Sequence, residues 1–291
     1  MHHTDRRDFL RLAGIAGVTF TAGLFPGRQA GAQAAGDFHF VQISDTHWGY
    51  KGPANPDAEH TLEKAIVTVN GLAQKPDFIV FTGDLTHTTE DGKERRARMA
   101  RFKEIASALA VKDVRFLPGE HDASLDKGEA FKEFFGATHW TFDHKGVHFI
   151  ALDNVSDPAA RLGDEQLAWL AADLKQRKPD DRIVVLTHRP LFDLVPNWDW
   201  TTADGAKAID LLMPYQNVVV FYGHIHQENH HMTGHIAHHA AKSLIFPQAA
   251  PGDAPKRPPP PPFDASLAPL GTRDVTMSSK IVITELPVTK A

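Results

Sequence analysis

The chain has 291 residues with globular proportions of apolar (42%) and charged (23%) side chains, which excludes disorder throughout. It contains no cysteine, so disulfides, thiolate metal sites and a cysteine nucleophile are excluded. The formal net charge of −5, without a long basic run, argues against binding of duplex nucleic acid or a polybasic membrane contact. Histidine is over-represented with 18 residues, and neutral imidazole is a common ligand of transition metals.

The first 34 residues have the pattern of an export signal. Arg6 and Arg7 precede an apolar stretch over residues 12–25, and small residues with A-x-A spacing follow at 30–34. This resembles a twin-arginine signal peptide, which implies the twin-arginine export machinery as a partner and a periplasmic or secreted protein. The alternatives are a frayed helix and an uncleaved anchor. Because the apolar run is shorter than the roughly 20 residues of a spanning helix, we expect no stable membrane span in the mature form.

Beyond residue 34, short apolar runs alternate with segments of helical period, which is typical of layered α/β folds. The apolar runs predict strands over residues 38–44, 78–82, 114–117, 147–152, 183–187, 218–222, 243–246 and 280–286. The helical spacing predicts helices over residues 57–73, 93–110, 129–135, 164–176 and 203–213. We therefore expect a single domain over residues 35–291, with a sheet core covered by helices.

A proline-rich segment over residues 251–262 interrupts this pattern, and it contains five consecutive prolines at 258–262. Such a run favours polyproline II and cannot join a sheet ladder. We expect a surface excursion that precedes the last strand. The alternative is a proline-rich ligand for a partner domain.

Five predicted strands end in residues that can bind a metal or transfer a proton. These ends are Asp45-Thr46-His47, Gly83-Asp84, Gly119-Glu120-His121-Asp122, Thr187-His188 and Gly223-His224-Ile225-His226. In layered α/β folds, ligands bind beyond the carboxyl ends of strands, so we expect the five loops to converge on one rim. Each motif alone is no more than a loop or a turn. The argument rests on their order, their placement and their residue types together.

The ordered set resembles the calcineurin-like metallophosphoesterase superfamily, whose signature is D-x-H, G-D, G-N-H-D/E, a later H and G-H-x-H. The match runs from about residue 38 to residue 226. It implies an α/β fold, a four-layer α/β/β/α sandwich of two mixed sheets flanked by helices. The helix start at residues 162–170 is also similar to that of relatives that cleave cyclic nucleotides and glycerophosphodiesters.

The resemblance implies a centre of two divalent or mixed-valence metal ions that acts on a small phosphate ester. Its implied ligands are Asp45, His47 and His226 for one ion, Glu120, His188 and His224 for the other, and Asp84 as the bridge. Oxygen and imidazole donors suit Mn, Fe, Zn or Ni. Two such ions would generate a bridging hydroxide that attacks phosphorus in line. His121 would then stabilise the transition state or protonate the leaving oxygen, and the adjacent Asp122 is the second candidate catalytic residue.

Two residues depart from the family pattern. Glu120 stands where the family has Asn, which adds a negative charge and removes an amide N–H donor for phosphate. His87 stands where many relatives have Asp, Asn or Tyr, so the partner of His121 is open between Asp122 and a backbone carbonyl. The sequence thus leaves three functions: a general phosphoesterase, a cyclic-nucleotide or glycerophospho-diesterase, and a metal- and phosphate-binding protein that Glu120 has impaired.

Five more histidines follow the last motif within ten residues of one another. We expect them in an irregular surface loop or at the rim of a pocket, with direct metal ligation as the alternative. They are His230, His231, His235, His238 and His239.

Overall fold

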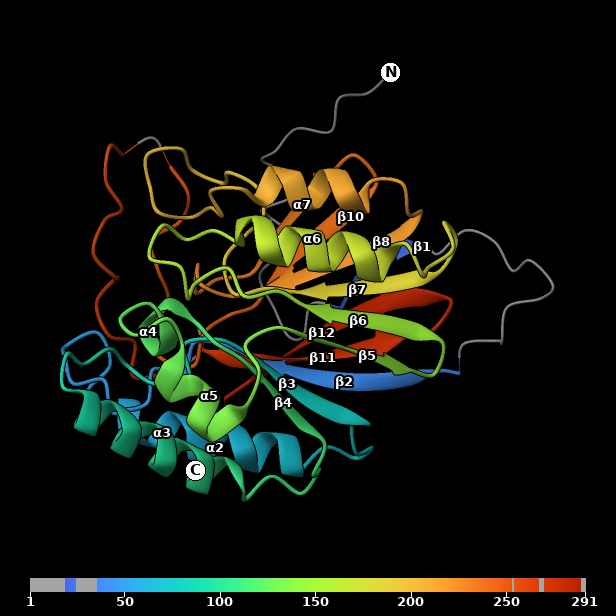
Figure 1. The fold of residues 1–291 in the computed structure, drawn as a ribbon. Coiled ribbons are helices and arrows are strands. Elements are labelled where there is room, and N and C mark those ends of the chain that lie inside the picture. The colour runs from blue at the N-terminus through green and yellow to red at the C-terminus, as the bar shows by residue number, and fades with distance from the viewer. Residues whose placement is uncertain (1–18, 25–35, 253, 267–269, 289–291) are drawn as a thin grey trace.

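The protein is a sandwich of two six-stranded sheets with helices on both outer faces (Figure 1). The computed structural model describes residues 19–24, 36–252, 254–266 and 270–288. Within these residues, helices α6 (Gly163–Leu174) and α7 (Gly205–Leu212) cover one sheet. Helices α2 (Ala58–Asn70), α3 (Gly92–Ala106) and α5 (Glu129–Phe135) cover the other. The predicted four-layer α/β/β/α architecture is confirmed.

The first sheet has the strand order β1-β12-β11-β2-β3-β4. Strands β2, β3 and β4 are parallel, whereas β11 and β12 are antiparallel to their neighbours and β1 pairs antiparallel with β12. Parallel neighbours end at the same edge of a sheet, so this order brings the loops after β2, β3 and β4 together. The bounds are Thr19–Leu24 for β1, Phe38–Ile43 for β2, Phe78–Thr82 for β3, Val114–Leu117 for β4, Gly271–Met277 for β11 and Lys280–Pro287 for β12.

The second sheet has the strand order β5-β6-β7-β8-β10-β9. Strands β6, β7, β8 and β10 are parallel, and the two edge strands β5 and β9 are antiparallel to their neighbours. The loops after β7 and β8 therefore leave the same edge of this sheet. The bounds are Trp140–His144 for β5, Val147–Ala151 for β6, Arg182–Leu186 for β7, Asn217–Tyr222 for β8, Asn229–Thr233 for β9 and Ile236–Ala240 for β10.

The central strands are buried on both faces, which explains their nearly continuous apolar runs. Successive side chains of a strand point to opposite faces. In β2, Phe40 packs between the sheets and Val41 packs toward α2 and α3. In β7, Val184 packs between the sheets and Val185 packs toward α6 and α7. The molecule thus has three parallel apolar layers.

The strand predicted over residues 243–246 is wrong, because this buried segment is irregular. Its backbone polar groups are used by the neighbouring loops instead of a strand. The carbonyl of Phe246 accepts hydrogen bonds from the hydroxyl of Ser243 (2.6 Å) and from Nδ1 of His226 (2.8 Å). The amide of Leu244 donates to the carbonyls of Ser44 and Asp45. The segment supports the strand-end loops from outside the sheets.

Strands β1, β5, β9, β10 and β11 are not among the predicted elements. The expectation of an irregular histidine cluster is also wrong, because β9 carries His230 and His231 and β10 carries His238 and His239. The two strands pair antiparallel, with His238 opposite His231. Histidine is neither strongly apolar nor β-branched, so a pattern of apolar residues does not reveal such a hairpin.

The predicted export signal falls mostly outside the described residues. Of residues 1–34, the structure describes 19–24 as strand β1, and the arginine pair and the predicted cleavage region lie outside. The signal peptide therefore stays a prediction. Among the described helices, none combines the length and the apolar character that crossing a membrane requires.

A buried ion pair within the first sheet is linked to the second sheet by a hydrogen bond of its arginine. Arg273 in β11 is fully buried and donates to Oε1 of Glu285 in β12 through Nε (2.9 Å) and Nη2 (2.7 Å). Its Nη2 also donates to the carbonyl of Ala240 in β10 (2.6 Å), which belongs to the other sheet. Since a buried charge is tolerated only when it is paired, this arginine ties together three strands of two sheets.

We expect Arg273→Ala to lower the free energy of unfolding by about 3–5 kcal/mol, because Glu285 would remain buried without its cation. Urea unfolding followed by circular dichroism measures this loss. The double variant Arg273→Met/Glu285→Leu leaves no unpaired charge and should recover much of the loss. If the double variant is as unstable as the single one, the charge of Glu285 is not the cause.

Candidate metal centre

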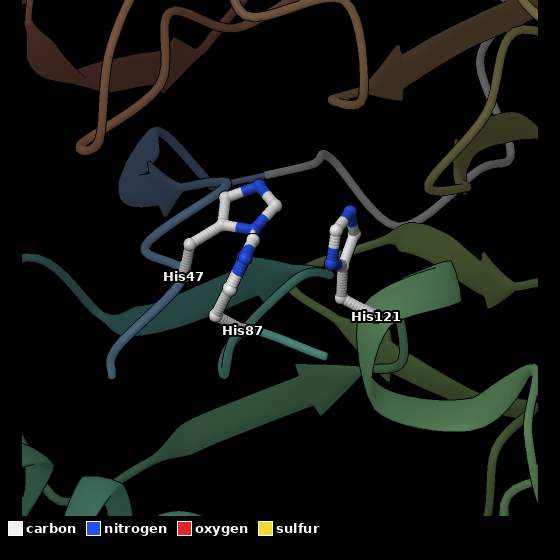
Figure 2. A group of neighbouring side chains, drawn as sticks. All are labelled: His47, His87 and His121. Atoms are coloured by element: carbon white, nitrogen blue, oxygen red, sulfur yellow. Dashed lines mark hydrogen bonds between the residues drawn. The ribbon is translucent and has the colours of Figure 1, made fainter. Parts of the chain in front are cut away.

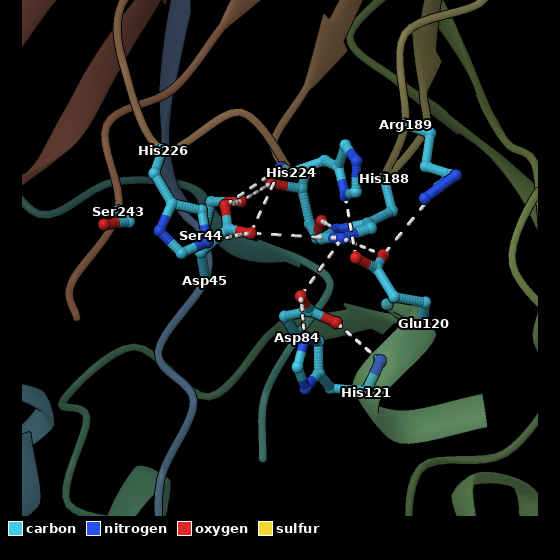
Figure 3. A network of polar contacts seen from close by, with 12 residues as sticks. Ser44, Asp45, Asp84, Glu120, His121, His188, Arg189, His224, His226 and Ser243 are labelled. Atoms are coloured by element: carbon cyan, nitrogen blue, oxygen red, sulfur yellow. Dashed lines mark hydrogen bonds and ion pairs between the residues drawn. The ribbon is translucent and has the colours of Figure 1, made fainter. Parts of the chain in front are cut away.

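The five motif-bearing loops meet at one edge of the sandwich. The loops after β2, β3 and β4 come from the first sheet, and those after β7 and β8 come from the second. Figure 3 shows the side chains of Asp45, Asp84, Glu120, His188 and His224 pointing toward one another from these loops. The structure therefore brings together residues that are up to 181 positions apart, from Asp45 to His226.

The backbone turns sharply where these side chains leave the strands. Five of the site residues have positive φ angles, a region that costs about 1–3 kcal/mol for residues with a side chain. Aspartate and histidine are unusual in tolerating it to some degree. Such turns project a side chain back toward the strand end within a single residue. The angles are 53° for Asp45, 42° for His47, 51° for Asp84, 65° for His224 and 54° for His226.

The converging side chains form four overlapping groups that could hold a metal ion: two contain His121, with His47 and His87 or with Asp84 and Glu120, and the other two share no residue. In one of these other two groups the ligand atoms of Asp45, His47, Asp84 and His226 lie within 4.8 Å of one another, and all four residues are buried. The second group consists of Glu120, His188 and His224. This division is the one that the family resemblance implies. The assignment of individual ligands stays a prediction.

Asp84 lies between the two groups. Its Oδ2 is 3.3 Å from Nε2 of His47 in the first group and 3.4 Å from Nε2 of His188 in the second. Its Oδ1 accepts a hydrogen bond from the backbone N–H of His121 (2.9 Å), which fixes the orientation of the carboxylate. A carboxylate in this position can bridge two cations.

Backbone carbonyls fix the ring tautomers of three histidines. Nδ1 of His188 lies 2.7 Å from the carbonyl of Thr82, and Nδ1 of His226 lies 2.8 Å from that of Phe246. Nε2 of His224 lies 3.2 Å from the carbonyl of Asp199. Because a carbonyl only accepts, each of these nitrogens carries a hydrogen. The other nitrogen of each ring then faces the ligand groups, which is the usual arrangement of metal-binding histidines.

The second group contains buried polar atoms that make no hydrogen bond among the described residues. Oε2 of Glu120, Nε2 of His188 and Nδ1 of His224 are all in this state. Glu120 nevertheless lies 2.9 Å from each of the two rings. Buried polar atoms are normally paired, so lone pairs that converge without hydrogen-bond geometry fit a cation between them. These donors suit the first-row metals Mn, Fe, Zn and Ni.

The charges of the site match this interpretation. Burial and the charge of Glu120 act to raise the pKa of Asp84, but the surrounding imidazoles bring it to about 2. Burial would lower the pKa of His188, yet the carboxylates of Asp84 and Glu120 hold it well above its ordinary value. Without a cation, His188 therefore carries a proton among ionised carboxylates. A metal ion would replace that proton.

Thr88 is the hydrogen-bond partner of His121, and it is neither of the two partners that the sequence left open. Nδ1 of His121 lies 2.6 Å from the Thr88 hydroxyl and accepts from the Thr88 backbone N–H at 3.3 Å. In the neutral ring the hydrogen is therefore on Nε2, which lies 3.9 Å from Oδ2 of Asp84. Figure 2 shows His47, His87 and His121 gathered on this side of the site. Burial, with help from His121, lowers the pKa of His87 to about 4, so His87 is neutral at pH 7.

Asp122 has a supporting place in the structure. Its carboxylate accepts hydrogen bonds from the backbone N–H groups of Leu85 (2.9 Å), Thr86 (2.9 Å) and Gly119 (3.0 Å). Burial and the charge of Asp84 raise its pKa to about 7 in spite of these bonds. Asp122 thus fastens the loop after β4 to the loop after β3. This geometry favours a positioning role, and the catalytic role stays a prediction.

Arg189 is a buried cation at the site, and it is not among the site residues predicted from the sequence. Its Nε lies 3.9 Å from Oε2 of Glu120, and its Nη2 donates to Oδ2 of Asp199 at 3.2 Å. Only 8% of its side chain is exposed, so its charge is poorly screened by solvent. It offsets part of the charge that Glu120 adds. The available signal was its position directly after His188.

A pocket of about 310 Å³ opens over the two groups. Its lining includes five of the seven candidate ligand residues together with His87, His121, Phe246, Gln248, Arg257 and residues 258–260; Asp45 and His188 are not part of it. The proline-rich segment is exposed, as a surface excursion should be, but it also forms a wall of the pocket. The second-sheet histidines of β9 and β10 are not part of this lining. Nor do they belong to any candidate ligand group among the described residues.

The fold and the site define a metal-dependent phosphoester hydrolase. The model of the calcineurin-like phosphoesterase family matches residues 38–228, so the chain belongs to this family. A probable glycerophosphodiester phosphodiesterase of Arcobacter nitrofigilis is 29% identical over 203 residues, covering 64% of this chain and 71% of the relative. The 3',5'-cyclic adenosine monophosphate phosphodiesterase of Pseudomonas aeruginosa is 28% identical over 232 residues, covering 74% and 78%. A dimetal phosphatase of Danio rerio shares the fold, with a TM-score of 0.58 and 14% identity over 87% of this chain and 99% of the other.

We expect Asp84→Ala to remove both metal ions, because its carboxylate lies 3.3 Å and 3.4 Å from a histidine of each ligand set. Elemental analysis of the purified protein measures the metal content. The control is His238→Ala, which should keep both ions because His238 belongs to none of the candidate ligand groups among the described residues. Two ions per chain in Asp84→Ala would refute the bridging assignment.

Proposed function

We propose that the protein hydrolyses phosphodiesters with two divalent metal ions and that it does so after export. The observation that carries the diester preference is Glu120, a carboxylate 2.9 Å from each of two histidines in the second ligand group. The names of the relatives support the same class, since those described above act on a glycerophosphodiester and on a cyclic nucleotide. The substrate class is therefore a cyclic nucleotide or a glycerophosphodiester.

Two bound cations would supply a nucleophilic hydroxide at neutral pH and would stabilise charge on the phosphoryl oxygens. The chain itself supplies the proton for the leaving oxygen. His121 lines the pocket, its Nδ1 is held by Thr88, and its Nε2 hydrogen is free to face a substrate. A positioned imidazole of this kind is a common general acid.

The charge of Glu120 selects between ester types. Three carboxylates, from Asp45, Asp84 and Glu120, belong to the candidate ligand groups and would reduce the net field of two bound cations. A weaker positive field lowers the attraction of a dianionic monoester more than that of a monoanionic diester, because the Coulomb energy scales with the product of the charges. Arg189 restores only part of the field, since it also pairs with Asp199. The balance favours a diester.

The alternative is a protein that binds metal and phosphate without turnover because Glu120 replaces a neutral amide. It predicts full metal occupancy and phosphate binding together with no hydrolysis of either ester type. The enzymatic proposal predicts turnover of a diester in the protein loaded with Mn²⁺. An assay with both reporters on the loaded protein separates the two.

We expect Glu120→Asn to raise monoester turnover relative to diester turnover by on the order of tenfold, which corresponds to about 1.4 kcal/mol. The reason is that the substitution keeps an oxygen ligand, removes one negative charge and restores an N–H donor. The measurement is kcat/KM for 4-nitrophenyl phosphate and bis(4-nitrophenyl) phosphate, together with metal content. Glu120→Ala should lower occupancy of the second metal ion.

The matched control is Glu104→Asn, which removes the same charge from the exposed face of α3, where 67% of the side chain is accessible. It should leave the ratio and the metal content unchanged. If Glu120→Ala also leaves occupancy and both activities unchanged, Glu120 is not a ligand. Another group would then have to complete the second site.

For export, we expect the double variant Arg6→Lys/Arg7→Lys to stay in the cytoplasm with an active folded domain. The pair is recognised by a receptor, and a lysine pair keeps the charge but not the recognition. Cell fractionation with a diesterase assay of each fraction measures this. The control is the single variant Arg11→Lys, which leaves the pair intact and should be exported. Normal export of the double variant would refute the twin-arginine route.

A further inference from the structure

Part of the pocket lining comes from a part of the chain that the family model does not match. We call residues 254–263 the proline arm. It runs down the left edge of the view in Figure 1, on the same side of the molecule as α4 (Glu120–Ala123). The family match ends at residue 228, whereas the arm lines the pocket with Arg257 and residues 258–260. The candidate ligand residues and this wall therefore lie in separate parts of the chain.

The arm is held at both ends and is stiff between them. At one end the indole N–H of Trp198 donates to the carbonyl of Ala254 (2.9 Å), and Ala254 packs against the cluster that contains Trp198 and Trp200. At the other end Phe263 packs against the apolar layer between the first sheet and its helices. Each proline between these points has a fixed φ angle, so the run has few conformations to lose on binding a ligand.

Arg257 is the cation that this stiff segment presents to the pocket. Its nearest acidic partner is Asp199, at 4.0 Å from Nη1 to Oδ1, while Arg189 takes the other oxygen of Asp199 at 3.2 Å. No hydrogen bond of the Arg257 guanidinium is found among the described residues, although the group has five donors. About a third of its side chain (34%) is exposed. Arg257 is therefore available to a ligand.

Gln248 is a second polar residue in this part of the pocket lining. Oε1 of Gln248 is buried and accepts no hydrogen bond among the described residues, and Gln248 lines the same pocket. Phe246 and residues 258–260 add apolar surface around these two groups. An apolar wall with a few placed polar groups is the usual composition of a specific small-molecule site.

We propose that the proline arm binds the leaving group of the substrate and that Arg257 binds an anionic substituent on that leaving group. This rests on the proposed phosphodiesterase function. In an in-line displacement the entering and leaving oxygens lie on opposite sides of phosphorus. With the phosphoryl group at the ligand residues, the leaving alcohol points away from them into the pocket that the arm also lines. The arm thus determines which alcohol is accepted, and the ligand residues determine which bond is cleaved.

The test compares two diesters that differ only in the leaving group, methyl 4-nitrophenyl phosphate and its analogue with a 3-carboxylate on the ring. Intrinsic reactivity cancels when the ratio of their kcat/KM values is compared between variants. We expect Arg257→Gln to lower this ratio, carboxylated over neutral, by about tenfold, as for loss of one charge-assisted hydrogen bond. Arg257→Lys keeps the charge and should retain most of the preference.

The matched control is Lys256→Gln, which removes the same charge from the adjacent residue of the arm, outside the pocket lining. It should leave the ratio unchanged. Calorimetric titration of the Mn²⁺-loaded protein with the two released phenols gives a readout that does not need turnover. Wild type should bind the carboxylated phenol about tenfold more tightly, and Arg257→Gln should lose this difference.

Three results would overturn the proposal: equal ratios in wild type and Arg257→Gln, an equal effect of Lys256→Gln, or equal binding of the two phenols by wild type. If the loaded wild type cleaves neither diester, the proposed function fails. The titration then still decides whether the arm binds an anionic alcohol.

Discussion

The position of Asp84 is the constraint on which the site depends. Its carboxylate touches His47 from the first sheet and His188 from the second, and the backbone of His121 holds it in place. A group that must meet partners from both sheets requires the two sheets to keep a fixed position relative to each other at this edge. Buried Arg273, which pairs with Glu285 and donates to the carbonyl of Ala240 in the other sheet, constrains the same relative position. The core and the centre thus constrain each other.

Conformational strain and charge are concentrated in the same few residues. Five site residues have left-handed backbone angles, and Asp45, Asp84 and Glu120 bring negative charge into a buried volume. Neither feature is favourable by itself. The free energy of metal binding would offset both costs, since metal binding contributes directly to the stability of the folded state. We therefore expect bound metal to increase the order of the loops at this edge more than that of the strands.

The sequence predicted a sheet core covered by helices because its central strands are buried on both faces and appear as apolar runs, and the family resemblance implied the four-layer arrangement. It predicted the residues at the site because motifs such as Asp45 to His47 follow those runs directly. It did not predict the hairpin of β9 and β10, whose histidines hide the strand pattern. Nor did it predict Thr88, Arg189 or the place of the proline arm, since their roles arise from contacts across the fold. Thr88 acts through His121, and Arg257 meets the pocket only because Trp198 and Phe263 anchor the arm.

Strand β1 lies within the predicted signal peptide, so cleavage of that peptide would change the first sheet. Residues 19–24 form the outer strand of the first sheet and pair with β12 from Lys280 to Thr284. If the proposed export signal is cleaved after residue 34, this strand leaves and β12 becomes the boundary of a five-stranded sheet. Its unpaired backbone groups would then offer a template for another chain, which is the usual route to aggregation. Lys280 at its start and Pro287 at its end are residues that hinder such pairing, so a chain cleaved in this way would keep some protection against self-association.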